Sequence, residues 1–202
     1  FTCLPTFAIC FEGYLGTPVE DGGDIHIAVD GNLHHRHQTS AGNGVPFHSS
    51  KRMLDKEFVD RIGVRISEAR KKPPKKRKTE VPDEVVDACQ HSYQAAKGDE
   101  KSGTLKIFDE NGLMALVCRH DIPIFFASID TPGEQQKYAV ALIEKLFSMI
   151  PKHATVLGLY DIACVVDRSR ELYDIFPESI STRLTLATSV MHSYDISGYV
   201  SV

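Results

Sequence analysis

The stretch Asp24-Ile-His-Ile-Ala-Val-Asp30, followed by Gly31 and Asn32, decides the fold. Polar and apolar residues alternate along it, which is typical of a half-buried β-strand, and the glycine–asparagine pair after it indicates a turn. The strand ends in the carboxylate of Asp30. Open α/β sheets place their reactive groups outside the carboxyl ends of their strands, so this stretch supplies the first strand and the first candidate for chemistry.

Helical and strand-like patterns alternate along the rest of the chain. Thr131, with Glu134 three residues later, has the pattern of a helix start, with Thr131 as the N-cap and Pro132 as the first helical residue. The expected elements are helices over 51–70 and 83–96, a hairpin over 113–118 and 122–129, a helix from 131 to about 150, a strand over 154–160, a helix near 165–175 and a strand over 183–193. This order predicts a mixed α/β sheet flanked by helices, with a helical insert between the first strand and the hairpin.

Length and composition fit one α/β domain or a core with an insert, since the chain has 202 residues and 42% of them are hydrophobic. No run approaches the roughly 18 apolar residues of a membrane span, so we expect no membrane partner. The apolar opening Phe1–Phe11 lacks the basic start of a secretory signal. Because the chain begins with Phe1 rather than Met, we expect a fragment at this end. Five widely spaced cysteines favour a reducing compartment over a disulfide scaffold.

Positive charge is concentrated in one block. Residues 51–80 hold twelve Lys/Arg and five Asp/Glu, a net charge of +7, whereas the whole chain has −4 and the remainder therefore −11. The densest part contains two prolines and is expected to be an exposed linker. Its basic residues are Lys71, Lys72, Lys75, Lys76, Arg77 and Lys78. Such runs bind polyanions by counterion release or serve as nuclear localisation signals, and a merely solvated linker is the alternative.

Asp30 has a counterpart in Asp161, which follows a second apolar strand. If the two strands are neighbours, the carboxylates converge and repel each other, and a hard cation such as Mg²⁺ or Mn²⁺ relieves that repulsion. Two such ions can clamp the attacking and leaving oxygens of a phosphodiester displacement. The alternative is that both aspartates are turn residues or helix caps.

Two further groups are candidates for binding. Cys89 and Cys118 each stand two residues before a histidine, and Cys89, Cys118 and His120 are the best candidate ligands for zinc. Buried thiols and polar histidines are the alternative. A second group follows the first aspartate and is either a DNA contact or a solvated loop. It consists of His34, His35, Arg36 and His37.

Four strings in the chain resemble motifs of the Kyakuja–Dileera–Zisupton (KDZ) transposases, which are DDE-type enzymes. They are Gly22-Gly-Asp-Ile-His-Ile-Ala-Val-Asp-Gly-Asn-Leu-His-His-Arg-His37, Gly112-Leu-Met-Ala-Leu-Val-Cys-Arg-His-Asp121, Asp130-Thr-Pro-Gly-Glu-Gln-Gln-Lys-Tyr-Ala139 and Leu159-Tyr-Asp-Ile-Ala-Cys164. The likeness runs from about residue 22 to 194, in order and at family-like spacings. The Cys-Arg-His-Asp and Thr-Pro-Gly-Glu-Gln-Gln-Lys-Tyr strings are its most specific parts.

The resemblance implies a ribonuclease H-like fold, a nuclear location and an Asp, Asp, Glu metal triad. It also implies the cutting and joining of DNA at the ends of a mobile element, with a homo-oligomer assembling on that DNA. Asp30 and Asp161 become the first two members of the triad, and Arg119, Asp121 and His192 match other family motifs. The implied core covers 21–50 and 102–194, with the insert at 51–101. A lead segment with a degenerate cysteine motif covers 1–20, and a divergent tail covers 195–202.

The match fails at both ends. Phe7 stands where the family has the first cysteine of a pair, and no glutamate follows Glu178. We therefore expect a C-terminally truncated core that lacks its third carboxylate and does not catalyse strand transfer.

Loss of the helix that carries this carboxylate is expected to uncover apolar positions on one sheet face, at Leu184, Leu186 and Val190. Two alternatives stay open. One is a non-catalytic, domesticated or decaying transposase-derived nuclear DNA-binding protein. The other is a ribonuclease H-like nuclease acting alone, against which the long insert speaks.

Overall fold

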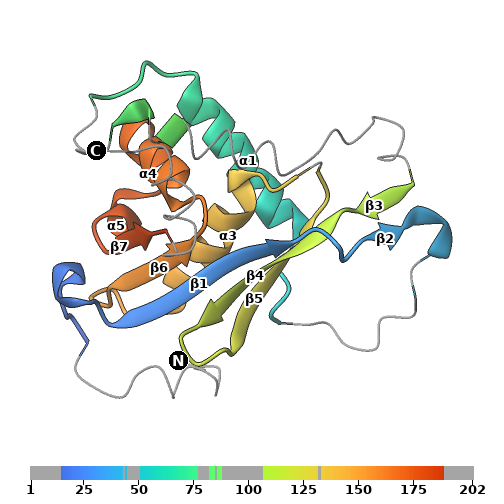
Figure 1. Ribbon diagram of the computed structural model, residues 1–202, viewed down its shortest axis with the longest axis horizontal. Helices are drawn as coiled ribbons and strands as arrows, with labels where there is room; N and C mark the ends of the chain where they lie inside the picture. Colours follow the sequence, from blue (N-terminus) through green and yellow to red (C-terminus); the bar gives the residue numbers. More distant parts are fainter. Residues whose placement is uncertain are drawn as a thin grey trace, which may run out of the picture.

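A computed structural model of the protein describes residues 15–42, 44, 51–76, 82–84, 86–87, 107–131 and 133–188. Its centre is a five-stranded sheet in the order β5-β4-β1-β6-β7 (Figure 1). The strands are β1 (Ile25–Asn32), β4 (Gly112–Cys118), β5 (Pro123–Ile129), β6 (Val156–Tyr160) and β7 (Leu184–Ala187). β4 is antiparallel to β1 and β5, whereas β6 is parallel to β1 and β7. The predicted mixed α/β sheet is confirmed.

β1 lies in the middle of the sheet, paired with β4 on one side and with β6 on the other, and every second side chain along it is apolar. Ile25, Ile27 and Val29 are each at most 3% exposed and form its core face. Asp30, on the opposite face, is exposed. The strand continues through Gly31 to its end, so the turn predicted at the glycine–asparagine pair begins later than expected, at residue 33.

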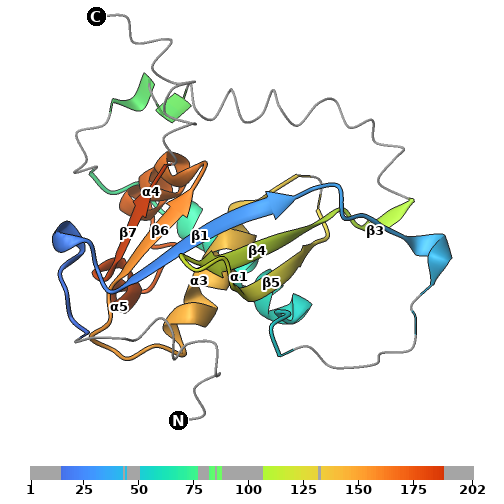
Figure 2. The same ribbon diagram turned by 60° about the horizontal axis from the view of Figure 1, so that its bottom comes forward.

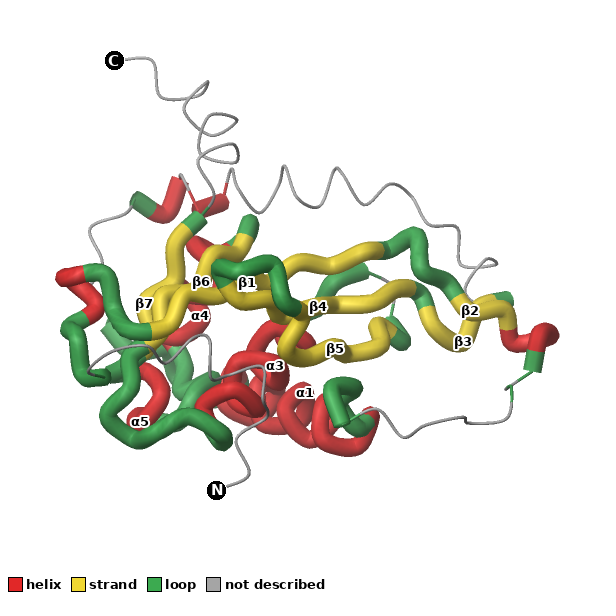
Figure 3. The backbone as a smooth tube through the Cα atoms, turned by 90° about the horizontal axis from the view of Figure 1, so that it is seen from below, coloured by secondary structure: helices red, strands yellow, loops and turns green. Residues whose placement is uncertain are grey.

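Helices cover the core face of the sheet. They are α1 (Lys56–Arg70), α3 (Gln136–Phe147), α4 (Ala163–Leu172) and the short α5 (Glu178–Ser181). Figure 3 shows α1, α3 and α5 on the same side of the sheet. The side chains of α3 are buried for most of its length, and α1 packs against it with Val59, Ile62 and Ile66 in the same core. None of the described helices is long and apolar enough to cross a membrane.

The start of α3 differs from the prediction. The helix begins at Gln136, not at Pro132, a residue that lies outside the described ones. Gly133 has a φ of +70°, a left-handed conformation that interrupts a right-handed helix, so the chain still turns at this point. The hydroxyl of Thr131 hydrogen-bonds to the hydroxyl of Tyr138 at 2.8 Å, and it does not act as the predicted N-cap.

Two apolar side chains of β7 that were predicted to be exposed are buried. Leu184 and Leu186 are 3% and 7% exposed because α4 and α5 pack on this strand, so the expectation of exposure is wrong for both. Val190 lies outside the described residues. The apolar side chain that does face solvent nearby is Leu159 of β6, which is 45% exposed on the other face of the sheet.

A two-stranded ribbon extends the sheet beyond the end of β1. It pairs β2 (His37–Gln38) with β3 (Phe108–Glu110), and Figures 1 and 2 show it projecting away from the helices. The sequence patterns did not predict either of these short strands. A short 3₁₀ turn at Val19–Asp21 precedes β1, and a second one at Thr39–Ala41 follows β2.

Candidate functional site

The two predicted aspartates lie side by side at one edge of the sheet. β1 and β6 are parallel neighbours, and Val29 is the partner of Tyr160 in their register. Asp30 is the next residue of β1, and Asp161 directly follows the end of β6. Since neighbouring strands lie about 4.8 Å apart, the register brings the two carboxylate-bearing residues together. The expectation that they belong to adjacent strands is confirmed, and their role as metal ligands stays a prediction.

Asp30 lies on the solvent-facing side of β1. Its side chain is exposed, and its Oδ1 accepts a hydrogen bond from the backbone N–H of Gly31 at 2.7 Å. Among the described residues, no lysine or arginine forms an ion pair with it. Asp161 is half-buried and follows β6 directly, before α4 begins. The carboxyl edge of this strand pair is therefore acidic and accessible on the side of Asp30.

A third aspartate at the same edge has a different environment. Asp130 follows β5, and it forms ion pairs with Lys56 and Lys137. It also accepts a hydrogen bond of 2.6 Å from the hydroxyl of Tyr138. Two cations and one hydroxyl neutralise and hold this carboxylate, so Asp130 has the surroundings of a structural residue.

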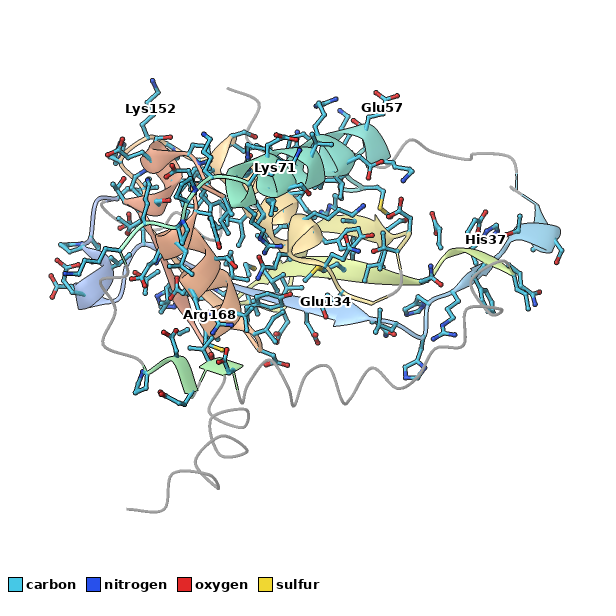
Figure 4. The ribbon with its side chains drawn as sticks, turned by 90° about the horizontal axis from the view of Figure 1, so that it is seen from above. His37, Glu57, Lys71, Glu134, Lys152 and Arg168 are labelled. Atoms are coloured by element: carbon cyan, nitrogen blue, oxygen red, sulfur yellow. The ribbon has the colours of Figure 1, made fainter. Side chains whose placement is uncertain are left out.

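A buried glutamate that the sequence did not single out lies close to the aspartate pair. Glu134 is 9% exposed and sits just before α3, beside β1 (Figure 4). The hydroxyl of Tyr160 donates a hydrogen bond of 2.9 Å to its Oε1. Its place in an apparent helix-start motif did not predict this burial, because a capping glutamate points back to its own backbone and not into a core.

The histidine-rich group lies on the way from β1 into the ribbon. His34, His35 and Arg36 are exposed, and the guanidinium of Arg36 stacks 5.6 Å from the ring centre of Phe108. The Nδ1 atom of His37 lies 2.6 Å from Oδ1 of Asp109 on the facing strand. This hydrogen bond raises the pKa of His37 above 6.5. His34, His35 and Arg36 therefore lie between the end of β1 and the ribbon, and His37 is the first residue of the ribbon.

The candidate zinc ligands lie at the opposite edge of the sheet. The Sγ of Cys118 is 3.8 Å from Nδ1 of His120 in the β4–β5 turn. The backbone N–H of Arg119 donates to the carbonyl of His26, near the start of β1, and Asp121 has a φ of +58°. Because β4 runs antiparallel to β1, this turn is separated from Asp30 by about 10 Å of strand.

The zinc site stays a prediction because its third candidate, Cys89, lies outside the described residues. Within the part of the chain that the structure describes, no three His, Cys, Asp or Glu residues gather as a metal site. His192, another residue that matches a family motif, also lies outside it.

The basic run follows α1 directly. Residues 71–76 are exposed, as predicted, whereas Arg77 and Lys78 lie outside the described residues. The backbone N–H of Lys75 donates to the carbonyl of Leu172, and its ammonium pairs with Asp174. Lys71 pairs with Glu68.

Two further lysines, Lys72 and Lys76, have no ion pair with a described residue. The run therefore presents positive charge next to the end of α4.

Comparison with known proteins finds a family match. A sequence model described as the Kyakuja-Dileera-Zisupton transposase matches residues 24–195. The matched region contains β1, the sheet and both aspartates. No curated protein and no solved structure matches the chain significantly.

Proposed function

The chain belongs to the Kyakuja-Dileera-Zisupton (KDZ) transposase family, and we propose that it forms the ribonuclease H-like catalytic core of a DDE-type DNA transposase. In this core, Asp30 and Asp161 hold a divalent cation for phosphodiester chemistry at the ends of a mobile element. One observation carries the proposal: the two aspartates follow Val29 and Tyr160, which are paired on neighbouring parallel strands. Open α/β sheets bind their substrates at this edge.

The arrangement of the sheet supports the ribonuclease H-like part of the proposal. β1, β4 and β5 form an antiparallel meander, and β6 and β7 are added in parallel on the other side of β1. Each parallel strand is reached through a helix, first α3 and then α4. A three-stranded meander continued by two parallel strands is the arrangement expected of that fold.

The chemistry of the two side chains fits Mg²⁺ or Mn²⁺. These ions take oxygen ligands, and Mg²⁺ is commonly held by one or two carboxylates together with waters and phosphate oxygens. When bound, such ions stabilise the attacking and leaving oxygens of a phosphodiester displacement. Asp30 is exposed and lacks an ion pair among the described residues, so its charge is available to a cation.

We propose that the 202 residues bind a divalent ion without cleaving DNA. A two-metal site needs more ligands than Asp30 and Asp161 provide by themselves. Zinc, if held at Cys118 and His120 with Cys89, would be structural because this turn lies at the other edge of the sheet.

DNA is the partner that the proposal requires. His34, His35 and Arg36 are exposed between Asp30 and the ribbon, where a phosphate backbone can reach them. The exposed basic run at 71–76 adds contacts that do not read sequence, and a nuclear location and a homo-oligomer on DNA belong to the same proposal.

The test combines two assays on the 202-residue protein and on the variant Asp30→Asn/Asp161→Asn. Titration calorimetry should detect Mn²⁺ binding to the parent protein and not to the variant, and labelled DNA should be bound by both and cleaved by neither. Equal Mn²⁺ binding by both proteins would overturn the assignment of the aspartates. Metal-dependent cleavage by the parent alone would overturn the proposed inactivity.

A non-catalytic DNA-binding protein is the second candidate. The exposed charge of residues 71–76 favours it, because such a run binds DNA without any help from the strand ends. In this case DNA binding persists in the parent protein although no Mn²⁺ binds at the two aspartates.

A further inference from the structure

Glu134 is an unusual residue in the core. Among the described residues, it and Asn111 are the two polar side chains that are buried. Removing a carboxylate from water costs free energy unless it gains hydrogen bonds, so its position demands a role. It lies in the segment between β5 and α3. Its carboxylate lies against Gly31, on the side of β1 that also carries Val29, and this is the face that the helices cover.

The first contact of Glu134 is with the end of β6. Its Oε1 accepts the hydrogen bond from the hydroxyl of Tyr160, which is itself only 3% exposed. Tyr160 is the last residue of β6, and Asp161 follows it. A hydrogen bond to a carboxylate is stronger than one between neutral groups, so it restrains the strand end next to Asp161.

The second contact of Glu134 is with the end of β1. A Cβ atom built at Gly31 would lie 2.9 Å from the Cδ atom of Glu134, closer than real Cβ atoms approach other heavy atoms. The φ of Gly31 is not in the left-handed region, so the backbone conformation does not require a glycine there. The glycine is needed because the carboxylate of Glu134 lies against the strand immediately after Asp30.

We propose that Glu134 is a positioning residue that sets the spacing between Asp30 and Asp161, an inference that rests on the proposed function of these two aspartates. A single carboxylate touches the residue after Asp30 and the residue before Asp161. It therefore connects the ends of β1 and β6 on the face of the sheet that the helices cover. Residues that hold metal ligands in place are often as necessary for metal affinity as the ligands themselves.

Glu134 acts through the strands and does not bind the metal itself. Side chains alternate along β1, so Asp30 points away from the core face on which Glu134 lies. In keeping with this, no group of three potential ligands forms among the described residues.

The test is a set of variants whose Mn²⁺ affinity is measured by calorimetry. Glu134→Met removes the acceptor but keeps the length, and Tyr160→Phe removes the donor. Each should weaken Mn²⁺ binding about tenfold, the lower end of the usual effect of residues that support metal ligands. The double variant should be no weaker than either single one, because both remove the same hydrogen bond.

Two controls separate positioning from other roles. Glu134→Gln keeps an acceptor for Tyr160 and should retain most of the affinity, whereas a direct ligand would lose it. Tyr138→Phe removes a buried tyrosine hydroxyl that bonds to Asp130 and Thr131 instead of Glu134, and it should leave Mn²⁺ affinity nearly unchanged. If Glu134→Met does not fold, Tyr160→Phe carries the test with the loss of one oxygen atom.

Amide hydrogen exchange gives a readout that needs no metal. Tyr160→Phe should speed exchange at Gly31 and Asp161, and Tyr138→Phe should not. If the parent protein binds no Mn²⁺ but exchange still responds in this way, the proposed function fails while the joining of the strand ends stands. Unchanged exchange and unchanged Mn²⁺ affinity in Tyr160→Phe overturn the inference, as does a loss of affinity in Glu134→Gln as large as in Glu134→Met.

Discussion

The two ends of β1 carry aspartates with opposite surroundings. Asp24, just before the strand, accepts hydrogen bonds from the backbone N–H groups of Gly16, Thr17 and Thr155 at 2.8–2.9 Å. Asp30, near the other end, is exposed and accepts one from its neighbouring residue. Both aspartates lie where β1 meets β6, yet one carboxylate is satisfied by the protein and the other is left to solvent.

This difference indicates that the two ends of β1 have different roles, one structural and one in binding. At the amino end, Asp24 ties the segment before β1 to Thr155, which precedes β6, and so fixes how the two strands start. At the carboxyl end, Glu134 and Tyr160 hold the two strands from the core face. The side chain of Asp30 is therefore not needed to hold this part of the fold. An aspartate that is not needed for folding can be used for binding.

The largest expected effect is on stability at the amino end. Asp24→Ala leaves three backbone N–H groups without their acceptor and should lower the free energy of unfolding by about 3 kcal/mol. Urea denaturation measures this loss. Asp21→Ala, a change at a nearby exposed aspartate, is the matched control and should have little effect. A loss below about 1 kcal/mol in Asp24→Ala would remove the contrast between the two ends.

The second effect is a pH dependence that belongs to Asp24. Burial alone would raise the pKa of this carboxyl, but the hydrogen bonds from Thr155, Gly16 and Thr17 outweigh it and lower the pKa from 3.8 to about 2. The stabilisation is therefore complete above pH 4 and is lost as the pH falls towards 2, by about 2 kcal/mol. Urea midpoints between pH 5 and 2 should fall less steeply in Asp24→Asn. Parallel curves for the parent protein and the variant would contradict the assignment.

The same contrast between satisfied and unsatisfied charges applies to the basic run. Lys72→Gln/Lys76→Gln removes two charges that have no ion pair among the described residues, and Lys71→Gln/Lys75→Gln removes two that pair with Glu68 and Asp174. The first variant should reduce the slope of log affinity for DNA against log salt by about 2, and the second by less. Fluorescence anisotropy at several salt concentrations measures both. Equal slopes for the two variants would show that the pairs do not hold in solution.

The smallest expected effect on stability is at Asp30. Without a divalent ion, Asp30→Asn should change the free energy of unfolding by no more than about 0.5 kcal/mol, because the side chain is exposed and holds no other part of the fold. Urea denaturation beside Asp24→Asn gives the comparison. A loss at Asp30 as large as that at Asp24 would mean that both ends of β1 are structural.

Local patterns in the sequence predict much of this fold. Alternation of apolar residues locates β1, and the apolar run before Asp161 locates β6, so the aspartate pair follows once the two strands are placed side by side. The same patterns do not show which face the helices cover. Leu184 and Leu186 are spaced for one face of a strand, and only α4 and α5 decide that this face is buried.

The role of Glu134 could not be predicted from sequence because it depends on contacts between separate segments. Its motif with Thr131 resembles a helix start, and the left-handed conformation of Gly133 turns the glutamate into the core. The glycine–asparagine pair after Asp30 likewise indicated a turn. In the structure Gly31 stays in the strand, and the approach of Glu134 requires its lack of a side chain.

We expect one divalent ion to bind between Asp30 and Asp161, and cleavage of the backbone by a bound ion locates it directly. Fe²⁺ can stand in for Mg²⁺, and with ascorbate and peroxide it produces hydroxyl radicals that cut the nearest backbone. Mass spectrometry of the fragments should show two cuts, one near residue 30 and one near residue 161. Both should be absent in Asp30→Asn/Asp161→Asn and suppressed by excess Mg²⁺. Cuts confined to the region of Cys118 and His120, or no localised cuts, would show that the two aspartates do not hold the ion.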